Sequence, residues 1–150
     1  LQVMVTFSIK KFDVLTRNEL HDLFALRAAV FVVEQDCVYQ DVDGKDHKAL
    51  HVIGKIDNTI IAYTRIFKPG DYFKEASIGR VVVSKTFRHL NYGHQLMISS
   101  IEAVEISFNT KEIKLSAQKY LEKFYNNLGF KTIGESYLED GIPHIAMIKY

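Results

Sequence analysis

The spacing of apolar residues switches repeatedly between two periods along the chain, and this switching constrains the fold more than any other feature. Segment 3–9 alternates with the period of a strand, whereas segment 17–33 repeats with the period of a helix. The predicted strands are 3–9, 50–55, 60–67, 75–84, 112–117, 130–137 and 143–148, and the predicted helices are 17–33, 92–108 and 118–128. This order predicts an α/β domain with a mixed central sheet of about seven strands flanked by helices.

Short signals at the ends of these segments support their boundaries. Thr16, followed three residues later by Glu19, is a capping box at the start of the first helix. The Asp57-Asn58 pair predicts a hairpin, and Gly129 predicts the end of the third helix. The continuous run Val81-Val82-Val83 suggests that the fourth strand is buried on both faces.

The size and charge of the chain argue against several classes of partner. Its 150 residues have the usual length of one domain, and we expect residues 1–150 to form it. A formal net charge of +1 with scattered basic residues argues against nucleic acid and against a membrane surface. Since no apolar run reaches the ~18 residues of a transmembrane helix and residues 1–9 do not resemble a signal peptide, we expect a cytoplasmic protein.

The segment from Val81 to Met97 runs from a predicted strand through a short polar loop into a helix. A helix N-terminus presents unpaired N–H groups and the positive end of the helix dipole, so it can bind phosphate without a specific side chain. Arg88 could add a charged contact, and Gly93 lets the backbone approach a ligand closely. An ordinary strand–loop–helix connection has the same pattern, so the segment by itself leaves both interpretations open.

Within this segment, Arg88-x-x-Asn91-x-Gly93 resembles the pyrophosphate signature of the GNAT superfamily of acyltransferases, Arg/Gln-x-x-Gly-x-Gly/Ala. Val81-x-Val83 stands where a strand of that superfamily pairs with the pantetheine arm of coenzyme A. Asn91 departs from the signature because it replaces the first glycine. Asparagine tolerates positive φ better than most residues, so the loop can still form.

Further motifs extend the resemblance over nearly the whole chain. Residues 124–130 resemble the GNAT pattern of a tyrosine followed by Leu-Gly-Phe, although Gln118 replaces an asparagine that is common seven positions before the tyrosine. The ElaA-type GNAT proteins are the subgroup that is most similar, on the segments Leu26–Gln35, Tyr39–Asp46, Ala62–Arg65, Ile78–Val81, Ala117-Gln118 and Glu139–His144. This resemblance implies a single-domain GNAT fold and transfer of an acetyl group from acetyl-CoA to a primary amine, and it leaves the acceptor undefined.

The resemblance also implies which residues bind the donor and act on it. The cofactor-binding residues would be Val81, Val82, Val83, Arg88, His89, Leu90, Asn91, Tyr92, Gly93, His94, Gln118 and Tyr125. Acetyl-CoA would be the cosubstrate, and no metal is required. Main-chain N–H groups near residues 81–83 would polarise the thioester carbonyl, and Tyr125 would protonate the departing thiolate. The helical spacing of Phe124 and Tyr125 also allows a purely structural role in the core.

The general base has three candidates. Glu34 ranks first because it ends the first helix beside an acidic loop, where an amine could approach. His144 ranks second because it follows the last turn and histidine suits proton transfer near neutral pH. Glu75, on the predicted central strand, ranks third. A structural or solvated role competes with each of these assignments, and a chain of waters could replace all three.

The acidic stretch Asp36, Asp41, Asp43 and Asp46 has several interpretations. It could attract a cationic amine, form a solvated loop, or hold a cation through oxygen ligands. Its spacing does not match an EF-hand, and His47 and His51 lack the helical context of a zinc pair, so we expect no metal. Cys37 is the only cysteine and has no positive neighbours in the sequence, which predicts a buried side chain rather than a nucleophile.

Two other functions stay open on the sequence alone. Acyl-homoserine-lactone synthases share the GNAT fold and resemble this chain around Arg27 and Asp41, but they usually carry tryptophan there and this chain has none. Asn91 leaves open a non-catalytic acyl-CoA-binding regulatory module. The expected partner is a small-molecule or peptide amine, and exposed sheet edges in such folds allow a homodimer.

Overall fold

The structure is a computed structural model that describes residues 4–150. Its strands are β1 (Thr6–Lys11), β2 (Leu50–Ile56), β3 (Thr59–Phe67), β4 (Ala76–Val83), β5 (Ile113–Gln118), β6 (Lys131–Glu139) and β7 (Ile142–Lys149). Its α-helices are α1 (Arg17–Arg27), α2 (Tyr92–Phe108) and α3 (Glu122–Asn126), and its other helical segments are η1 (Phe12–Val14), η2 (Ala28–Glu34), η3 (Lys85–Phe87) and η4 (Lys119–Leu121). Residue 3 of the first predicted strand lies outside the described residues.

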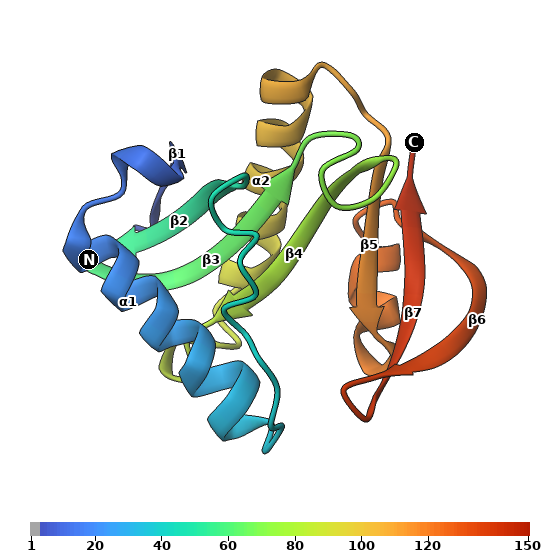
Figure 1. Cartoon of the computed structure of the whole chain (residues 1–150), viewed down its shortest axis with the longest axis horizontal. Helices are drawn as coiled ribbons and strands as arrows, with labels where there is room; N and C mark the ends of the chain where they lie inside the picture. Colours follow the sequence, from blue (N-terminus) through green and yellow to red (C-terminus); the bar gives the residue numbers. More distant parts are fainter. Residues whose placement is uncertain (1–3) are drawn as a thin grey trace.

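The strands of residues 4–150 form one seven-stranded sheet in the order β1-β2-β3-β4-β5-β7-β6 (Figure 1). Neighbouring strands are antiparallel except β4 and β5, which are parallel. Parallel neighbours need a long crossover, and the chain makes this crossover through α2. The mixed sheet with its flanking helices confirms the predicted α/β fold.

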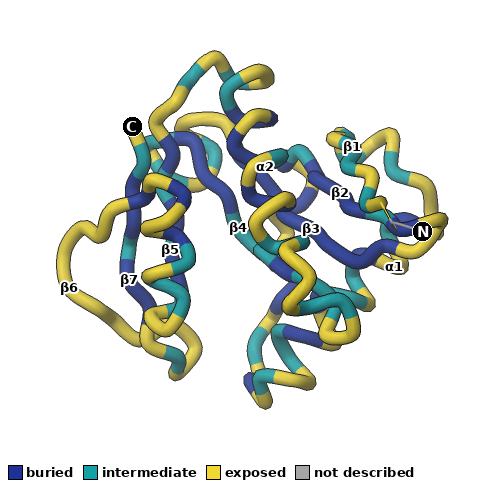
Figure 2. Tube along the Cα trace, turned by 180° about the vertical axis from the view of Figure 1, so that it is seen from behind, coloured by how far each residue is buried: buried dark blue, intermediate teal, exposed yellow. Residues whose placement is uncertain are grey.

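The helices cover opposite faces of the sheet because successive side chains of a strand point to opposite sides. On β2, Ile53 packs with Leu23 and Val30 from α1 and η2, whereas its neighbour Val52 belongs to a larger cluster with Leu96 of α2. These clusters bury β2 and β3 almost completely, as the dark tube of Figure 2 shows. The apolar core therefore sits around β2 and β3, with a helix on each face.

β4 and β5 pair at only two positions, Ala76 with Ile113 and Ser77 with Lys114. Beyond these positions the two strands separate, and the ribbon opens between them in Figure 1. Among the described strands, the remainder of β4 pairs with β3 alone. The other edge of residues 78–83 therefore has main-chain groups without a strand partner.

This separation changes the environment of the valine run on β4. Val82 is 3% exposed and packs toward α1, whereas Val81 and Val83 are only half-buried. The prediction that the run is buried on both faces is wrong, because it assumed a partner strand on each side. A β-bulge adds to the irregularity, since Arg80 has a φ of 52° and the register against β3 shifts near Tyr63.

The first helix matches its prediction at its start but not at its end. The capping box between Thr16 and Glu19 is present. At Ala28 the winding changes from α-helical to π-helical in η2, and the amide of Gln35 accordingly bonds to the carbonyl of Val30, five residues earlier. Apolar spacing does not distinguish these two windings, so the sequence did not indicate the change.

Other boundaries shift more modestly. Gln118 ends β5 instead of starting a helix, and the helix that follows stops at Asn126. Gly129 has a φ of 94°, in agreement with its predicted place after a helix. Ile9 is 44% exposed, so the predicted apolar face of the first strand does not extend to it. Within residues 4–150, no helix has both the length and the apolar character needed to cross a membrane.

Candidate active site

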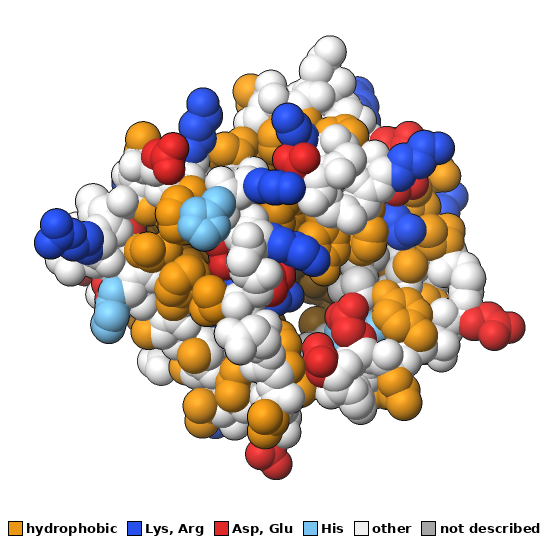
Figure 3. Space-filling model, viewed as in Figure 1, with side chains coloured by type: hydrophobic (Ala, Val, Ile, Leu, Met, Phe, Trp, Pro, Cys, Tyr) orange, Lys and Arg blue, Asp and Glu red, His pale blue; other side chains and the backbone are white. Residues whose placement is uncertain are grey.

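A cavity of about 700 Å³ lies where β4 and β5 separate. Its walls come from η2, the second half of β4, the loop before α2, the first turn of α2, the end of β5, α3 and the turn between β6 and β7. Figure 3 shows a hollow between the two halves of this face, with acidic and basic side chains near its edge. The volume falls within the ~300–1,000 Å³ range of small-molecule sites, which makes this cavity the candidate active site.

The loop that leads into α2 has an unusual backbone. His89 and Asn91 have φ values of 66° and 67°, and Asn91 is the left-handed N-cap of α2. A positive φ is uncommon outside glycine, but asparagine is among the residues that adopt it most readily. Asn91 therefore takes the backbone conformation that the glycine of the signature would allow.

The N-terminus of α2 opens into the cavity. The helix has 17 residues and begins without a side-chain cap. Its first main-chain hydrogen bond joins the amide of Gln95 to the carbonyl of Asn91 at 3.2 Å, so the preceding amides of Gly93 and His94 have no acceptor within the helix. Because Gly93 and His94 line the cavity, these amides and the helix dipole form a site suited to an anion.

Arg88 contacts both sides of the cavity. Its Nε donates to the carbonyl of Val83 at 3.1 Å, and its two terminal nitrogens donate to the carboxylate of Glu34, one of them at 2.8 Å. The side chains of Arg88 and Glu34 are 30% and 31% exposed. The hydrogen bond from Arg88 lowers the pKa of Glu34, which makes this carboxylate a weaker base than an ordinary glutamate.

Most of the residues that the sequence proposes for donor binding meet at this cavity. Val81, Val82, Val83, Arg88, His89, Asn91, Tyr92, Gly93, His94, Gln118 and Tyr125 line it. Leu90 does not line it, and this residue is 56% exposed. A Cβ atom at Gly93 would meet Phe124 at an ordinary 3.7 Å, which means that packing within the protein does not itself require glycine there.

Tyr125 is a buried polar residue at the cavity wall. It is 4% exposed, and its ring packs edge-on against Phe124 and Phe130 at centroid distances of 5.1 and 6.1 Å. Among the contacts of residues 4–150, the Tyr125 hydroxyl has no hydrogen-bond partner. Burial raises the pKa of Tyr125, so the hydroxyl keeps its proton at neutral pH. The residue therefore belongs to the core and also carries a proton donor at the cavity.

His144 lies on β7 in another wall of the cavity. Its side chain is 9% exposed, and its Nδ1 lies 2.7 Å from the carbonyl oxygen of Ile142. A carbonyl only accepts, so Nδ1 must donate and the neutral ring carries its lone pair on Nε2. Nε2 lies 3.3 Å from the carboxylate of Glu139.

Polar contacts link the segment that follows η2 to the strands on the other side of the cavity. Gln118 is paired with His144 across β5 and β7, and its side-chain amide donates to the side-chain oxygen of Gln35 at 3.1 Å. The Sγ atom of Cys37 lies 3.4 Å from the main-chain oxygen of Asp140 in the last turn. Cys37 is 8% exposed, which confirms its predicted burial. These contacts join the segment after η2 to β5 and to the turn between β6 and β7, across one end of the cavity.

Glu75, the third candidate base, does not belong to this site. It precedes β4, which begins at Ala76, and it does not line the cavity. The prediction that Glu75 lies on the central strand is therefore wrong. The cavity opens near the other end of β4, where the strand has already separated from β5.

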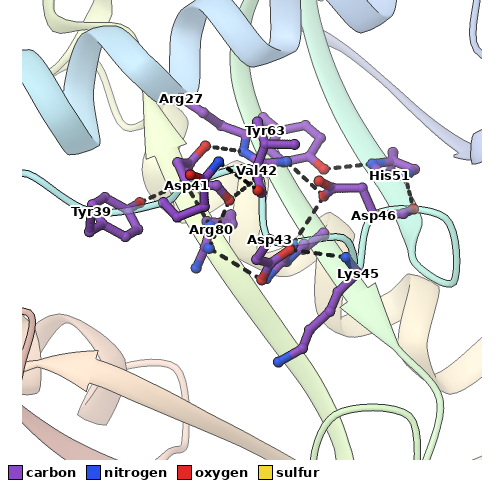
Figure 4. Close-up of polar contacts among 12 residues, drawn as sticks. Arg27, Tyr39, Asp41, Val42, Asp43, Lys45, Asp46, His51, Tyr63 and Arg80 are labelled. Carbon is purple, nitrogen blue, oxygen red and sulfur yellow. Dashed lines mark hydrogen bonds and ion pairs between the residues drawn. The ribbon is translucent and has the colours of Figure 1, made fainter.

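The acidic stretch is paired with buried arginines (Figure 4). Arg27 donates to Asp41 at 2.8 Å and to Asp46 at 2.7 Å, and Arg65 donates to Asp43 at 2.6 Å and to Asp46 at 3.1 Å. Arg27 and Arg65 are 0% and 1% exposed. Burial by itself raises a carboxyl pKa, but the arginine hydrogen bonds outweigh it and lower the pKa of Asp43 and Asp46. The interpretations as a solvated loop and as an attractor of amines are therefore wrong for these three aspartates, and Asp36 stays exposed outside the network.

Arg80 connects this network to the cavity and is the residue that the sequence reasoning missed. Its Nε lies 2.8 Å from Asp41, and its terminal nitrogen donates to the Asp41 carbonyl at 3.0 Å. The hydroxyl of Tyr39 donates to the same aspartate at 2.6 Å. The resemblance to the ElaA-type motif includes Arg80, but no local pattern indicates that it holds the loop against the bulge of β4.

The two histidines of the zinc alternative have separate structural roles. His51, on β2, lies between the hydroxyl of Tyr63 at 2.5 Å and the carbonyl of Asp46 at 2.9 Å. The ring of His47 packs against Phe12 at 4.3 Å. In the part of the chain that the structure describes, no group of three or more His, Cys, Asp or Glu side chains could hold a metal ion.

Comparison with known proteins gives matches that span both halves of the sheet. A family model described as an acetyltransferase (GNAT) domain matches residues 15–150. The protein ElaA of Escherichia coli strain K12 is 42% identical over 137 residues, which cover 90% of each chain.

Two solved structures are similar over nearly the whole chain. A crystal structure of an acyl-CoA N-acyltransferase from Pseudomonas aeruginosa has a TM-score of 0.92 and 40% identity, over 98% of this chain and 100% of that one. A crystal structure of Escherichia coli ElaA has a TM-score of 0.91 and 39% identity, with the same coverage of 98% and 100%. The similarity therefore includes all the segments that enclose the cavity.

Proposed function

This chain belongs to the GNAT acetyltransferase family, and on that premise we propose that it transfers an acetyl group from acetyl-CoA to a primary amine of a small molecule or peptide. The amine attacks the thioester directly while both substrates are bound. One observation carries the proposal: a single cavity joins the anion site at the start of α2 with the two buried polar side chains Tyr125 and His144.

Main-chain groups explain how the donor would bind. The free edge of residues 78–83 on β4 can pair with the amides of the pantetheine arm as an added strand would. The amides of Gly93 and His94, with the dipole of α2, suit the diphosphate. The similar protein from Pseudomonas aeruginosa is by name an acyl-CoA N-acyltransferase, which supports a coenzyme A thioester as the donor.

Acyl transfer then needs stabilisation of an oxyanion and protonation of a leaving thiolate. N–H groups among residues 81–83 would polarise the thioester carbonyl and stabilise the tetrahedral intermediate, a contribution of about 3 kcal/mol in comparable sites. As the new C–N bond forms and the C–S bond breaks, Tyr125 would give its proton to the sulfur. Its burial and raised pKa keep that proton in place beforehand.

His144 suits the role of general base better than Glu34. The Nδ1 contact with the carbonyl of Ile142 leaves the lone pair of the neutral ring on Nε2, where it can accept a proton from the amine. Glu34 is bonded to Arg88, which lowers its pKa and its basicity. We therefore place proton removal from the amine at His144 and consider a different role for Glu34 below.

Calorimetric titration with acetyl-CoA, followed by a thiol-release assay over a panel of amines with mass detection of the product, tests the proposal. We expect saturable binding, thiol release that depends on the amine, and a product heavier by one acetyl group. Binding without turnover of any amine would favour a regulatory module instead. Turnover only with acyl carrier protein and S-adenosylmethionine would favour an acyl-homoserine-lactone synthase.

A further inference from the structure

Glu34 and Arg88 form an ion pair in the wall of the cavity. Arg88 belongs to the loop that precedes α2, at the anion site, and Glu34 is the last residue of η2. The next residue, Gln35, contacts the side chain of Gln118, which pairs with His144. Glu34 and His144 thus line the same cavity, and the carboxylate of Glu34 is bonded to Arg88 of the proposed donor site.

The contact between Glu34 and Arg88 competes with the contact that Arg88 would make to a diphosphate. Both terminal nitrogens of Arg88 donate to Glu34, and Nε donates to Val83. These atoms form the edges through which an arginine binds an oxyanion in bidentate fashion. A diphosphate at the loop would also lie near the Glu34 carboxylate, and like charges at such distances repel. Since both side chains are about a third exposed, at 30% and 31%, the pair is weak enough to exchange.

We propose that donor binding moves Arg88 from Glu34 to the diphosphate, and that the freed Glu34 carboxylate then binds a cationic group of the acceptor. The acceptor would accordingly be an amine that carries a second positive charge. Its reacting nitrogen would lie at His144, and its second ammonium would lie at Glu34. This inference rests on the proposed function, and it makes Glu34 a positioning residue for the acceptor.

The charges around this end of the cavity support a cationic acceptor. Glu139 and Asp140, at the turn between β6 and β7, also line the cavity, and Figure 3 shows acidic side chains beside the hollow. Arg80 lines the same cavity, but it is paired with Asp41 and Asp43 of the acidic stretch. Once Arg88 contacts a diphosphate, the Glu34 carboxylate would lose its cationic partner, and a second ammonium on the acceptor would replace it.

Titration of coenzyme A into the wild-type protein and into Glu34→Gln tests the exchange. The substitution removes the competing charge, so we expect coenzyme A to bind Glu34→Gln about two- to fivefold more tightly, the range for an ion pair of this exposure. Glu122→Gln is the matched control, because Glu122 pairs with Lys119 at similar exposure outside the cavity. An affinity that is unchanged or weaker in Glu34→Gln would overturn the inference, since a weaker one would mean that Glu34 holds Arg88 in place for the diphosphate.

Titration of 1,4-diaminobutane with and without saturating coenzyme A tests the second part of the proposal, that the freed Glu34 binds the acceptor. We expect the diamine to bind the coenzyme A complex several-fold more tightly than the free protein, and we expect Glu34→Gln to lose this coupling. Butylamine, which lacks the second charge, should show little coupling. Equal diamine binding in both states, or none in either, would overturn the inference alone. Failure of the wild-type protein to bind coenzyme A would contradict the proposed function as well.

Discussion

Two groups of arginines in this chain make similar ion pairs in very different surroundings. Arg27 and Arg65 are 0% and 1% exposed, and each is bonded to two aspartates of the loop that follows η2. Arg88 is 30% exposed and is bonded to one glutamate at the cavity. Breaking a buried pair leaves an uncompensated charge, whereas an exposed pair contributes little to stability. Burial therefore decides which arginine is fixed and which can change its partner.

The largest expected effect is on stability, from Arg27→Ala. This substitution removes one of the three arginines that compensate Asp41, Asp43 and Asp46. One buried negative charge is then left uncompensated, so we expect a loss of about 3–5 kcal/mol in the free energy of unfolding. Urea denaturation followed by circular dichroism measures it, with Arg88→Ala as the matched control, for which we expect a loss below about 1 kcal/mol. Equal losses for the two variants would break the distinction between the groups.

The next largest effect is on catalysis, from Tyr125→Phe. Tyr125 is buried like Arg27, but its hydroxyl has no hydrogen-bond partner among the described residues, so its removal should change stability by less than about 0.5 kcal/mol. As the proposed acid, it should contribute about 100-fold to kcat with little change in KM for acetyl-CoA. Steady-state kinetics with urea denaturation separates the two effects. An unchanged kcat would leave Tyr125 with a packing role only.

A smaller effect is expected on donor affinity, from Arg88→Ala. Loss of a charge-assisted contact to the diphosphate should weaken binding of coenzyme A by about tenfold. Calorimetric titration measures this change, and Lys119→Ala is the control because its ion pair with Glu122 lies outside the cavity. If Arg88→Ala bound coenzyme A as tightly as the wild-type protein, Arg88 would be a structural partner of Glu34 and not a ligand of the donor.

The smallest effect concerns Glu19, whose ion pairs are intermediate in exposure between those of Arg27 and that of Arg88. It is 5% exposed, but its partners Lys10 and Lys55 are partly exposed. Burial raises its carboxyl pKa, yet hydrogen bonds from Lys10, the amide of Thr16 and Lys55 outweigh this and lower the pKa to about 2. Because the folded pKa is depressed, the stabilisation is present above the ordinary value of 4.5 and is lost as the pH falls toward 2.

Glu19→Gln tests this pH dependence. We expect the substitution to cost about 1 kcal/mol at neutral pH, and the difference from the wild-type protein to disappear near pH 2. Urea denaturation over a series of pH values measures both quantities. A difference that stayed constant between neutral pH and pH 2 would show that Glu19 stabilises the protein through packing and not through its charge.

Local signals predicted much of the fold because they depend on neighbouring residues only. The capping box of Thr16 and Glu19 forms as expected, Asp57 turns the hairpin with a φ of 55°, and Asn91 adopts a φ of 67°. The donor-binding residues that the resemblance to GNAT proteins implied also line one cavity, with the exception of Leu90.

The features that were not predicted depend on partners far away in the sequence. Asp43 pairs with Arg65, 22 residues later in the chain, and Asp46 pairs with Arg27, 19 residues earlier. Nothing in the acidic stretch itself indicates these arginines. The separation of β4 from β5 and the contact between Glu34 and Arg88, which are 54 residues apart, likewise depend on how the strands assemble.

A crystal structure of the wild-type protein with coenzyme A would test the central claim most directly. We predict that the diphosphate lies against the amides of Gly93 and His94, and that the guanidinium of Arg88 has turned from Glu34 toward the phosphate oxygens. A nucleotide bound away from the start of α2, or a diphosphate there with Arg88 still on Glu34, would contradict the claim that this loop and its arginine together bind the donor.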